Sequence, residues 1–221
     1  MARDHARVNI DIWTDDDWRD LTHDGQWLYL NLVTGRSLSF AGMADWRPAR
    51  IAALTRDLEA ADVERFAIEL IDERFILPDP DTEEVLIRSF VKWDGLMRTP
   101  NIAKAMARDH GHAGSSILRS VFVDQMCKFH EKEPGLSGWN HAGDLLERRR
   151  MTFEEGVTEL FGEPSNQPSD QGSGKGSDQP LTQRREIRRL LRSPFSVLQS
   201  PSSSSVTYPP SPGEQPKAAN A

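Results

Sequence analysis

The chain has 221 residues, of which 37% are hydrophobic and 28% are charged, so its composition is that of a globular protein with one or two small domains. Its 27 basic and 34 acidic residues give a formal net charge of −7, which argues against a protein that coats DNA through bulk positive charge. The single cysteine, Cys127, excludes an intramolecular disulfide, and we therefore expect a cytoplasmic location. No stretch approaches the ~20 apolar residues of a membrane span, so we expect neither a membrane anchor nor a signal peptide.

The charge divides the chain near Pro164. Residues 1–163 contain 20 basic and 30 acidic residues, whereas residues 164–221 contain 7 basic and 4 acidic ones. The second part is mostly Ser, Pro, Gln and Gly, which predicts a disordered tail, because such a segment cannot bury enough apolar surface to fold. Residues 181–195 differ and are called the Arg-rich segment here. They combine apolar residues with five arginines and predict a basic amphipathic helix that forms on contact with a partner: Arg184, Arg185, Arg188, Arg189 and Arg192.

The first predicted elements are helical. Three consecutive aspartates at 15–17 favour the start of a short helix, because negative charge is stabilising near a helix N-terminus. Thr22 opens a second helix through about Val33, and its many apolar residues predict that it is buried. After a strand over residues 38–43, Pro48 suits the first turn of a helix that reaches about Leu54. Apolar residues at helical spacing then predict a further helix over residues 63–71 with one core face.

A hairpin follows this helix. Residues 74–77 and 85–91 are β-branched or aromatic runs, and the turn-forming sequence PDPDTEE separates them. The order helix, strand, helix, helix, hairpin is that of a winged helix-turn-helix domain, which we place at residues 1–92.

Residues 93–163 predict a helical extension. One helix begins after the cap at Thr99 and ends near His110, and another begins at Ser115 or Ser116 and ends before Pro134. The pattern Thr152-x-x-Glu155 is a capping box for a last helix, which Gly162 closes. The fold class expected for the whole chain is therefore mostly α (α+β): a winged helix-turn-helix domain, a helical extension over 93–163 and a disordered tail over 164–221.

Several blocks of the sequence resemble one family when they are taken in order. They are MARDHARVNIDIW, DDDWRDLT, GMADWRPARIAAL, EEVLIRSFVKWDGLMRTPN and SSILRSV. These blocks are similar to a family of small proteins of actinobacterial phages and prophages, over roughly residues 1–140. Members are described as helix-turn-helix DNA-binding proteins, similar in layout to the winged-helix domain of phage replisome organisers. The resemblance implies a winged-helix fold and a role in replication initiation or transcriptional regulation.

The surfaces that a winged helix turns toward DNA are acidic in this sequence. Periodicity places six residues on the outward side of the third helix of the winged-helix pattern: Asp62, Glu64, Arg65, Ile68, Glu69 and Asp72. The tip of the hairpin offers Asp79, Asp81, Glu83 and Glu84 and no basic residue. Phosphates would be repelled from such a tip, so we expect weak binding of duplex DNA.

Two groups of basic residues are the candidate DNA contacts. The first lies around the predicted helix-turn-helix and comprises Arg47, Arg50, Arg56 and Arg65. The second lies at the hairpin exit and on the next helix and comprises Lys92, Arg98, Lys104 and Arg108. The alternative for each of them is an ordinary solvated surface charge. The arginines of the Arg-rich segment are predicted to contact nucleic acid or a protein partner.

The sequence contains none of the common phosphate-binding or nucleophile motifs, so we expect a protein that is not an enzyme and needs no cofactor. We also expect no metal, since a site built from His110, His112, Cys127 and His130 would lack the paired short spacings of zinc ligands. The six tryptophans are expected in the core rather than as stacking platforms for bases.

The function expected from the sequence is that of a phage-derived winged-helix DNA-binding protein in replication initiation or transcriptional regulation. DNA is the expected partner, and a replication or transcription protein is a further candidate. The alternative is a protein-interaction adaptor that uses the same fold and the Arg-rich segment without binding DNA sequence-specifically.

Overall fold

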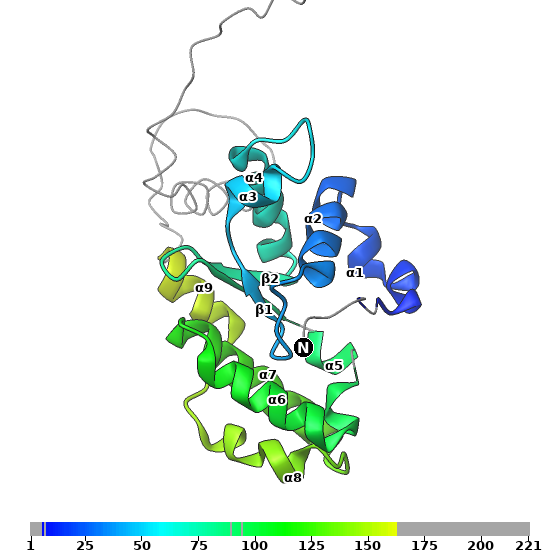
Figure 1. The fold of residues 1–221 in the computed structure, drawn as a ribbon, viewed down its shortest axis with the longest axis vertical. Helices are drawn as coiled ribbons and strands as arrows, with labels where there is room; N and C mark the ends of the chain where they lie inside the picture. The colour runs from blue at the N-terminus through cyan, green and yellow to red at the C-terminus, as the bar shows by residue number, and fades with distance from the viewer. Residues whose placement is uncertain (1–5, 7, 89, 94, 163–221) are drawn as a thin grey trace, which may run out of the picture.

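A computed structural model of the protein describes residues 6, 8–88, 90–93 and 95–162 (Figure 1). The first elements are the 3₁₀ helix η1 (Ile10–Thr14), α1 (Asp16–Arg19), α2 (His23–Thr34), β1 (Met43–Asp45), α3 (Pro48–Ala52) and α4 (Ala60–Asp72). They are followed by β2 (Ile76–Asp79), β3 (Glu84–Ile87), α5 (Phe90–Trp93), the 3₁₀ helix η2 (Leu96–Arg98) and α6 (Pro100–His112). The last elements are α7 (Ser116–Lys132), α8 (Trp139–Ala142), the 3₁₀ helix η3 (Gly143–Glu147) and α9 (Phe153–Phe161). Among these elements, none is a helix with the length and apolarity needed to cross a membrane.

The described part is mostly helical, as the sequence predicts, and it contains one three-stranded antiparallel sheet. The strand order is β1-β3-β2. The hairpin pairs Ile76 with Ile87, and β1 adds to the other edge of β3 with Met43 opposite Leu86. Thus β1, which precedes α3 and α4 in the chain, lies beside the second strand of the hairpin that follows them.

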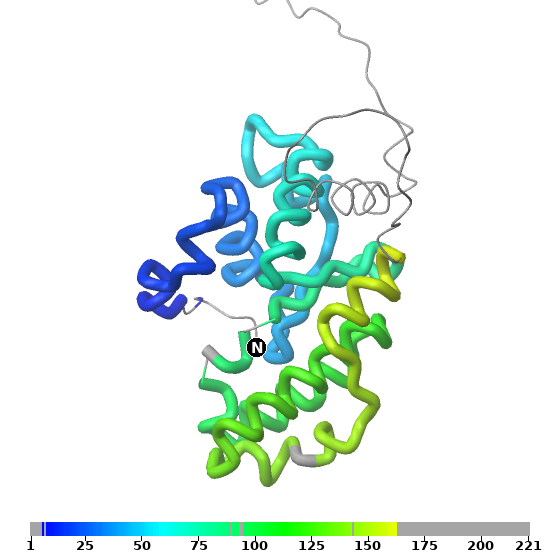
Figure 2. The backbone as a smooth tube through the Cα atoms, turned by 180° about the vertical axis from the view of Figure 1, so that it is seen from behind, coloured from blue at the N-terminus to red at the C-terminus, as the bar shows by residue number. Residues whose placement is uncertain are grey.

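Helices from both halves of the chain pack on this sheet. In Figures 1 and 2, α2, α3 and α4 lie toward one end of the molecule and α6, α7 and α8 toward the other, with the sheet between them. α4 and α9 both contact β2, and α7 contacts β3. Gly156 of α9 brings that helix close to the sheet, because a Cβ there would lie 2.7 Å from Val121 and 3.1 Å from Leu77. One buried cluster runs from Trp18 to Phe161, so the regions predicted as residues 1–92 and 93–163 share a core.

Three of the predicted helix caps are confirmed, whereas Thr99, which precedes α6, makes no side-chain cap hydrogen bond. The Thr22 side chain accepts a hydrogen bond from the Gly25 N–H at the start of α2, and the Ser115 side chain accepts one from Leu118 at the start of α7. At the start of α9, Thr152 and Glu155 form the predicted capping box. These caps satisfy N–H groups that have no partner within their own helix.

The predicted strand over residues 38–43 is wrong, because most of that segment is a turn. The Gly42 N–H donates to the Ser39 carbonyl at 3.1 Å, and Gly42 has a φ of 70°. Glycine adopts this left-handed conformation without the steric cost of a Cβ. Pairing with β3 therefore begins only at Met43.

The two strands of the hairpin begin and end at other residues than the sequence predicts. α4 closes with Arg74 in the left-handed conformation at a φ of 60°, and the Phe75 N–H reaches back to the Leu70 carbonyl, so β2 begins only at Ile76. β3 ends at Ile87, and residues 90–93 form the helix α5 rather than the strand predicted to reach residue 91. Beyond Ile87, one further backbone hydrogen bond joins the two sides of the hairpin, from the Arg88 N–H to the Phe75 carbonyl at 3.0 Å.

The expectation that all the tryptophans lie in the core is also wrong. Trp18 is fully buried, but Trp13 is 60% exposed and touches Trp18 edge to face with ring centroids 5.9 Å apart. The predicted disordered tail and its Arg-rich segment lie outside the described residues.

Candidate nucleic-acid interface

The first predicted group of cations comes together at one end of the molecule. Arg47 precedes α3, Arg50 lies in its last turn, Arg56 follows it in the loop to α4, and Arg65 lies on α4. All four side chains are exposed, and α3 packs against α4. We call these four residues the α3 surface; it lies near the end of the molecule farthest from α6 and α8 (Figure 1).

Two members of the α3 surface are engaged by carboxylates. Arg47 Nε donates to Glu83 Oε2 at 2.9 Å. Arg65 pairs with Asp62 at 2.9 Å, and its guanidinium lies 5.1 Å from the centre of the Phe66 ring.

The other two members, Arg50 and Arg56, have no ion-pair partner among the described residues. An exposed arginine without a carboxylate partner can contact a phosphate without first breaking an ion pair. Arg50 and Arg56 are therefore the members of the α3 surface best placed to do so.

The hairpin acids are used within the protein. Asp79 is 4% exposed, and its carboxylate accepts hydrogen bonds from the backbone of Asp81 and Thr82, which closes the turn. Glu84 accepts from the Gly114 and Ser115 N–H groups at 2.9 and 2.8 Å and so joins β3 to the start of α7. These two carboxylates stabilise the fold but keep their negative charge, and among the described residues Glu83 is the tip acid whose charge is offset by a cation, Arg47.

The sequence-based assignment of outward positions on α4 is wrong for two residues. Glu64 and Ile68 are only 7% and 3% exposed. The reason is that α4 packs against α2, α3 and β2. These neighbours cover more than one face of the helix, so residues outside the predicted core face are also buried. Glu69 is also engaged, since its carboxylate accepts hydrogen bonds from the Thr22 N–H and hydroxyl at 2.8 and 2.5 Å. Of the predicted outward residues, Arg65 is the one basic group that α4 could offer to DNA.

The second predicted group lies away from the first. Lys92 is on α5, Arg98 on η2, and Lys104 and Arg108 are one turn apart on α6. All four are exposed. Arg108 is held by Asp109, its neighbour in the chain, at 3.1 Å. Figures 1 and 2 place α6 toward the opposite end of the molecule from α3 and α4, so the two groups do not form one continuous surface.

The sequence analysis missed a third basic site. Arg148, Arg149 and Arg150 are consecutive and exposed in the segment that leads into α9. Arg148 pairs with Asp144 at 3.5 Å. The signal, three adjacent arginines, was plain in the sequence, although the sequence does not reveal which surface they reach.

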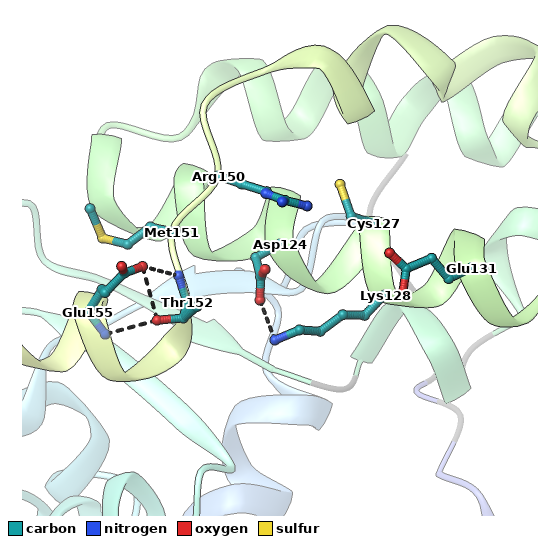
Figure 3. A pocket seen from close by; sticks show the side chains of 8 residues that line it. All are labelled: Asp124, Cys127, Lys128, Glu131, Arg150, Met151, Thr152 and Glu155. Atoms are coloured by element: carbon teal, nitrogen blue, oxygen red, sulfur yellow. Dashed lines mark hydrogen bonds and ion pairs between the residues drawn. The ribbon is translucent and has the colours of Figure 1, made fainter.

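Arg150 projects over a hollow of about 410 Å³ between α7 and the start of α9 (Figure 3). Charges of both signs line this hollow. Lys128 pairs with Asp124 at 2.6 Å, and Glu131 lies at its rim. Hydrogen bonds from the backbone and side chain of Thr152 lower the pKa of the Glu155 carboxyl. With three carboxylates against two cations, the hollow does not favour a phosphate.

The candidate metal ligands are not gathered into a site. Among the residues that the structure describes, no group of three or more histidine, cysteine or acidic side chains could hold an ion. His110 is buried beside Phe122, its Nε2 is 3.2 Å from the Arg119 carbonyl, and burial lowers its pKa. His130 instead packs edge to face on Trp139. These contacts are those of side chains that stabilise the fold.

The predicted contacts of the Arg-rich segment lie outside the described residues. Comparisons of this chain with protein-family models, with curated proteins and with solved structures found no match.

Proposed function

We propose that the protein binds duplex DNA through a winged helix-turn-helix formed by its first 92 or so residues and that it is not an enzyme. The fold supports this proposal through its chain order, in which α2, β1, α3 and α4 precede a β-hairpin, and through its strand order β1-β3-β2. In such a domain the helix pair α3 and α4 approaches the DNA and the hairpin lies beside the phosphate backbone. The proposed role is replication initiation or transcriptional regulation.

The observation that carries the proposal is the pair Arg50 and Arg56. Both are exposed beside the helix pair, and neither has an ion-pair partner among the described residues. Each can neutralise one phosphate, which releases about 0.9 counterions per contact. Such contacts attract DNA but do not read its sequence.

Recognition of specific DNA bases by α4 has less support. The loop of residues 53–59 between α3 and α4 is longer than the turn of about 3–4 residues in a typical helix-turn-helix. The outward residues of α4 are mostly acidic or engaged in contacts within the protein. We therefore propose weak duplex binding, dominated by phosphate contacts.

The test compares charge-neutralising variants of the full chain in a fluorescence-anisotropy assay with a labelled duplex. We expect Arg50→Gln/Arg56→Gln to weaken binding about tenfold or more at low salt. Arg149→Gln/Arg150→Gln removes the same charge from another surface and should change the affinity by less than about twofold.

Two outcomes would overturn the proposal. If Arg98→Gln/Lys104→Gln weakens binding while Arg50→Gln/Arg56→Gln does not, the interface is on the α6 side of the molecule. If the full chain binds no duplex at any salt concentration, the adaptor alternative replaces DNA binding. The hairpin gives that alternative little support, because Asp79 and Glu84 are already engaged within the protein.

A further inference from the structure

Three of the four large apolar side chains that are exposed in the described part lie at the beginning of the chain. Ile10 is 81% exposed, Trp13 is 60% exposed and Val8 is 39% exposed. Ile10 and Trp13 are three residues apart in η1, and residues at this spacing share one side of a 3₁₀ helix. Exposed large apolar side chains that lie together are typical of an interaction surface.

This surface is also strongly acidic. Residues 8–20 contain one arginine, Arg19, and five aspartates: Asp11, Asp15, Asp16, Asp17 and Asp20. Some of these aspartates act within the protein, since Asp15 caps α1 and Asp16 lies 3.8 Å from Arg19. The net charge of the stretch still favours a basic partner with apolar side chains. We call residues 8–20 the N-terminal surface.

One segment of the same chain has the complementary chemistry. The Arg-rich segment carries five arginines and one glutamate, and its Ile187, Leu190 and Leu191 have the spacing of one helical face. Arg184, Arg188 and Arg192 are four residues apart and would line one side of the same helix.

The chain is long enough to join the two. The 18 residues 163–180 can span about 60 Å, whereas a compact body of this size is about 40 Å across. The length of the linker therefore does not restrict where the Arg-rich segment can dock. The docking site must instead be identified by its charge and by its exposed apolar side chains. The remaining large apolar side chain that is exposed in the described part, Leu54, lies between Arg50 and Arg56 in the sequence. The positive charges of these two arginines would repel a basic segment.

We propose that the Arg-rich segment docks on the N-terminal surface of its own chain, with its apolar face on Ile10 and Trp13 and its arginines against the aspartates. Tethering raises the effective concentration of the segment to the millimolar range, so a contact that is weak between separate molecules is populated within one. While docked, these arginines are not available to phosphates. The proposal does not depend on whether the α3 surface binds DNA.

The test is hydrogen exchange of the full chain at low salt, read by mass spectrometry over residues 184–192. We expect exchange there to be about tenfold slower in the wild type than in the Ile10→Ser variant, because docking orders the segment. Leu54→Ser is the matched control, since it removes another exposed apolar side chain, and it should leave the protection unchanged. Asp16→Lys/Asp17→Lys should abolish the protection, and adding Arg188→Glu/Arg192→Glu should restore part of it.

Three results would overturn the proposal. The first is exchange of the segment in the wild type at the rate of an unstructured peptide. The second is protection that survives both Ile10→Ser and Asp16→Lys/Asp17→Lys. The third is protection that decreases on dilution, which would mean that the segment docks on a second copy of the chain.

Discussion

Replacing Glu83 by glutamine should strengthen DNA binding, because it releases an arginine of the α3 surface. Glu83 holds Arg47 through an ion pair of 2.9 Å. The glutamine keeps the size of the side chain and the positive φ of 54° at this position of the hairpin turn. The substitution therefore changes charge with little change of shape.

The magnitude follows from the exposure of the pair. At 2.9 Å the Coulomb attraction is about 1.4 kcal/mol in a water-like dielectric. The Arg47 and Glu83 side chains are 47% and 59% exposed, so solvent screening and side-chain entropy reduce the net value to about 0.2–1 kcal/mol. If Arg47 must leave Glu83 to reach a phosphate, removing that cost raises the affinity by about 1.5- to 5-fold.

The assay is fluorescence anisotropy of a labelled duplex titrated with the full chain. Glu131→Gln is the matched control, because it removes an exposed carboxylate of α7 on another surface and should leave the Kd unchanged. Equal or weaker binding by Glu83→Gln would refute the reasoning. An equal gain from Glu131→Gln would show that net charge, rather than the release of Arg47, sets the affinity.

Three further predictions concern stability and are measured by urea unfolding. Glu84→Ala leaves the Gly114 and Ser115 N–H groups without their acceptor and should lower the free energy of unfolding by about 2–4 kcal/mol. Glu83→Ala, which removes an exposed ion pair, should lower it by less than about 1 kcal/mol. Equal losses for the two variants would contradict the assigned roles. Gly138→Ala places a Cβ 2.5 Å from the Met97 carbonyl oxygen and should cost about 1–3 kcal/mol, whereas Gly135→Ala meets no atom within 4 Å and should be neutral. Burial lowers the pKa of His110, so the unfolded state binds a proton first as pH falls below about 6.5, and stability should fall by up to about 1.4 kcal/mol per pH unit. His110→Gln should flatten that dependence, and His112→Gln, which alters an exposed side chain, should not.

Local patterns predicted most of the elements. The apolar spacing of Val63, Phe66 and Leu70 predicted α4, and the capping residues Thr22 and Thr152 located two helix starts. These signals act within one or two helical turns, so the sequence alone reveals them. The extent of burial on α4 was missed, because it depends on neighbours that approach from α2 and α3.

The chemistry of the candidate interface depends on longer separations. Arg47 and Glu83 are 36 residues apart, and Glu84 reaches Gly114 across 30 residues. Composition therefore predicted an acidic hairpin tip but could not show that three of its carboxylates, those of Asp79, Glu83 and Glu84, have internal partners. The exposure of Trp13 was missed for a related reason, since a residue type indicates burial only on average.

The salt dependence of duplex binding tests the central claim, that exposed arginines beside α3 and α4 contact phosphates. The logarithm of the binding constant of the full chain is measured against the logarithm of the salt concentration, for the wild type and for Arg50→Gln/Arg56→Gln. Loss of two phosphate contacts should make the slope shallower by about 1.8. An unchanged slope, or a wild type that binds no duplex at low salt, would contradict the account.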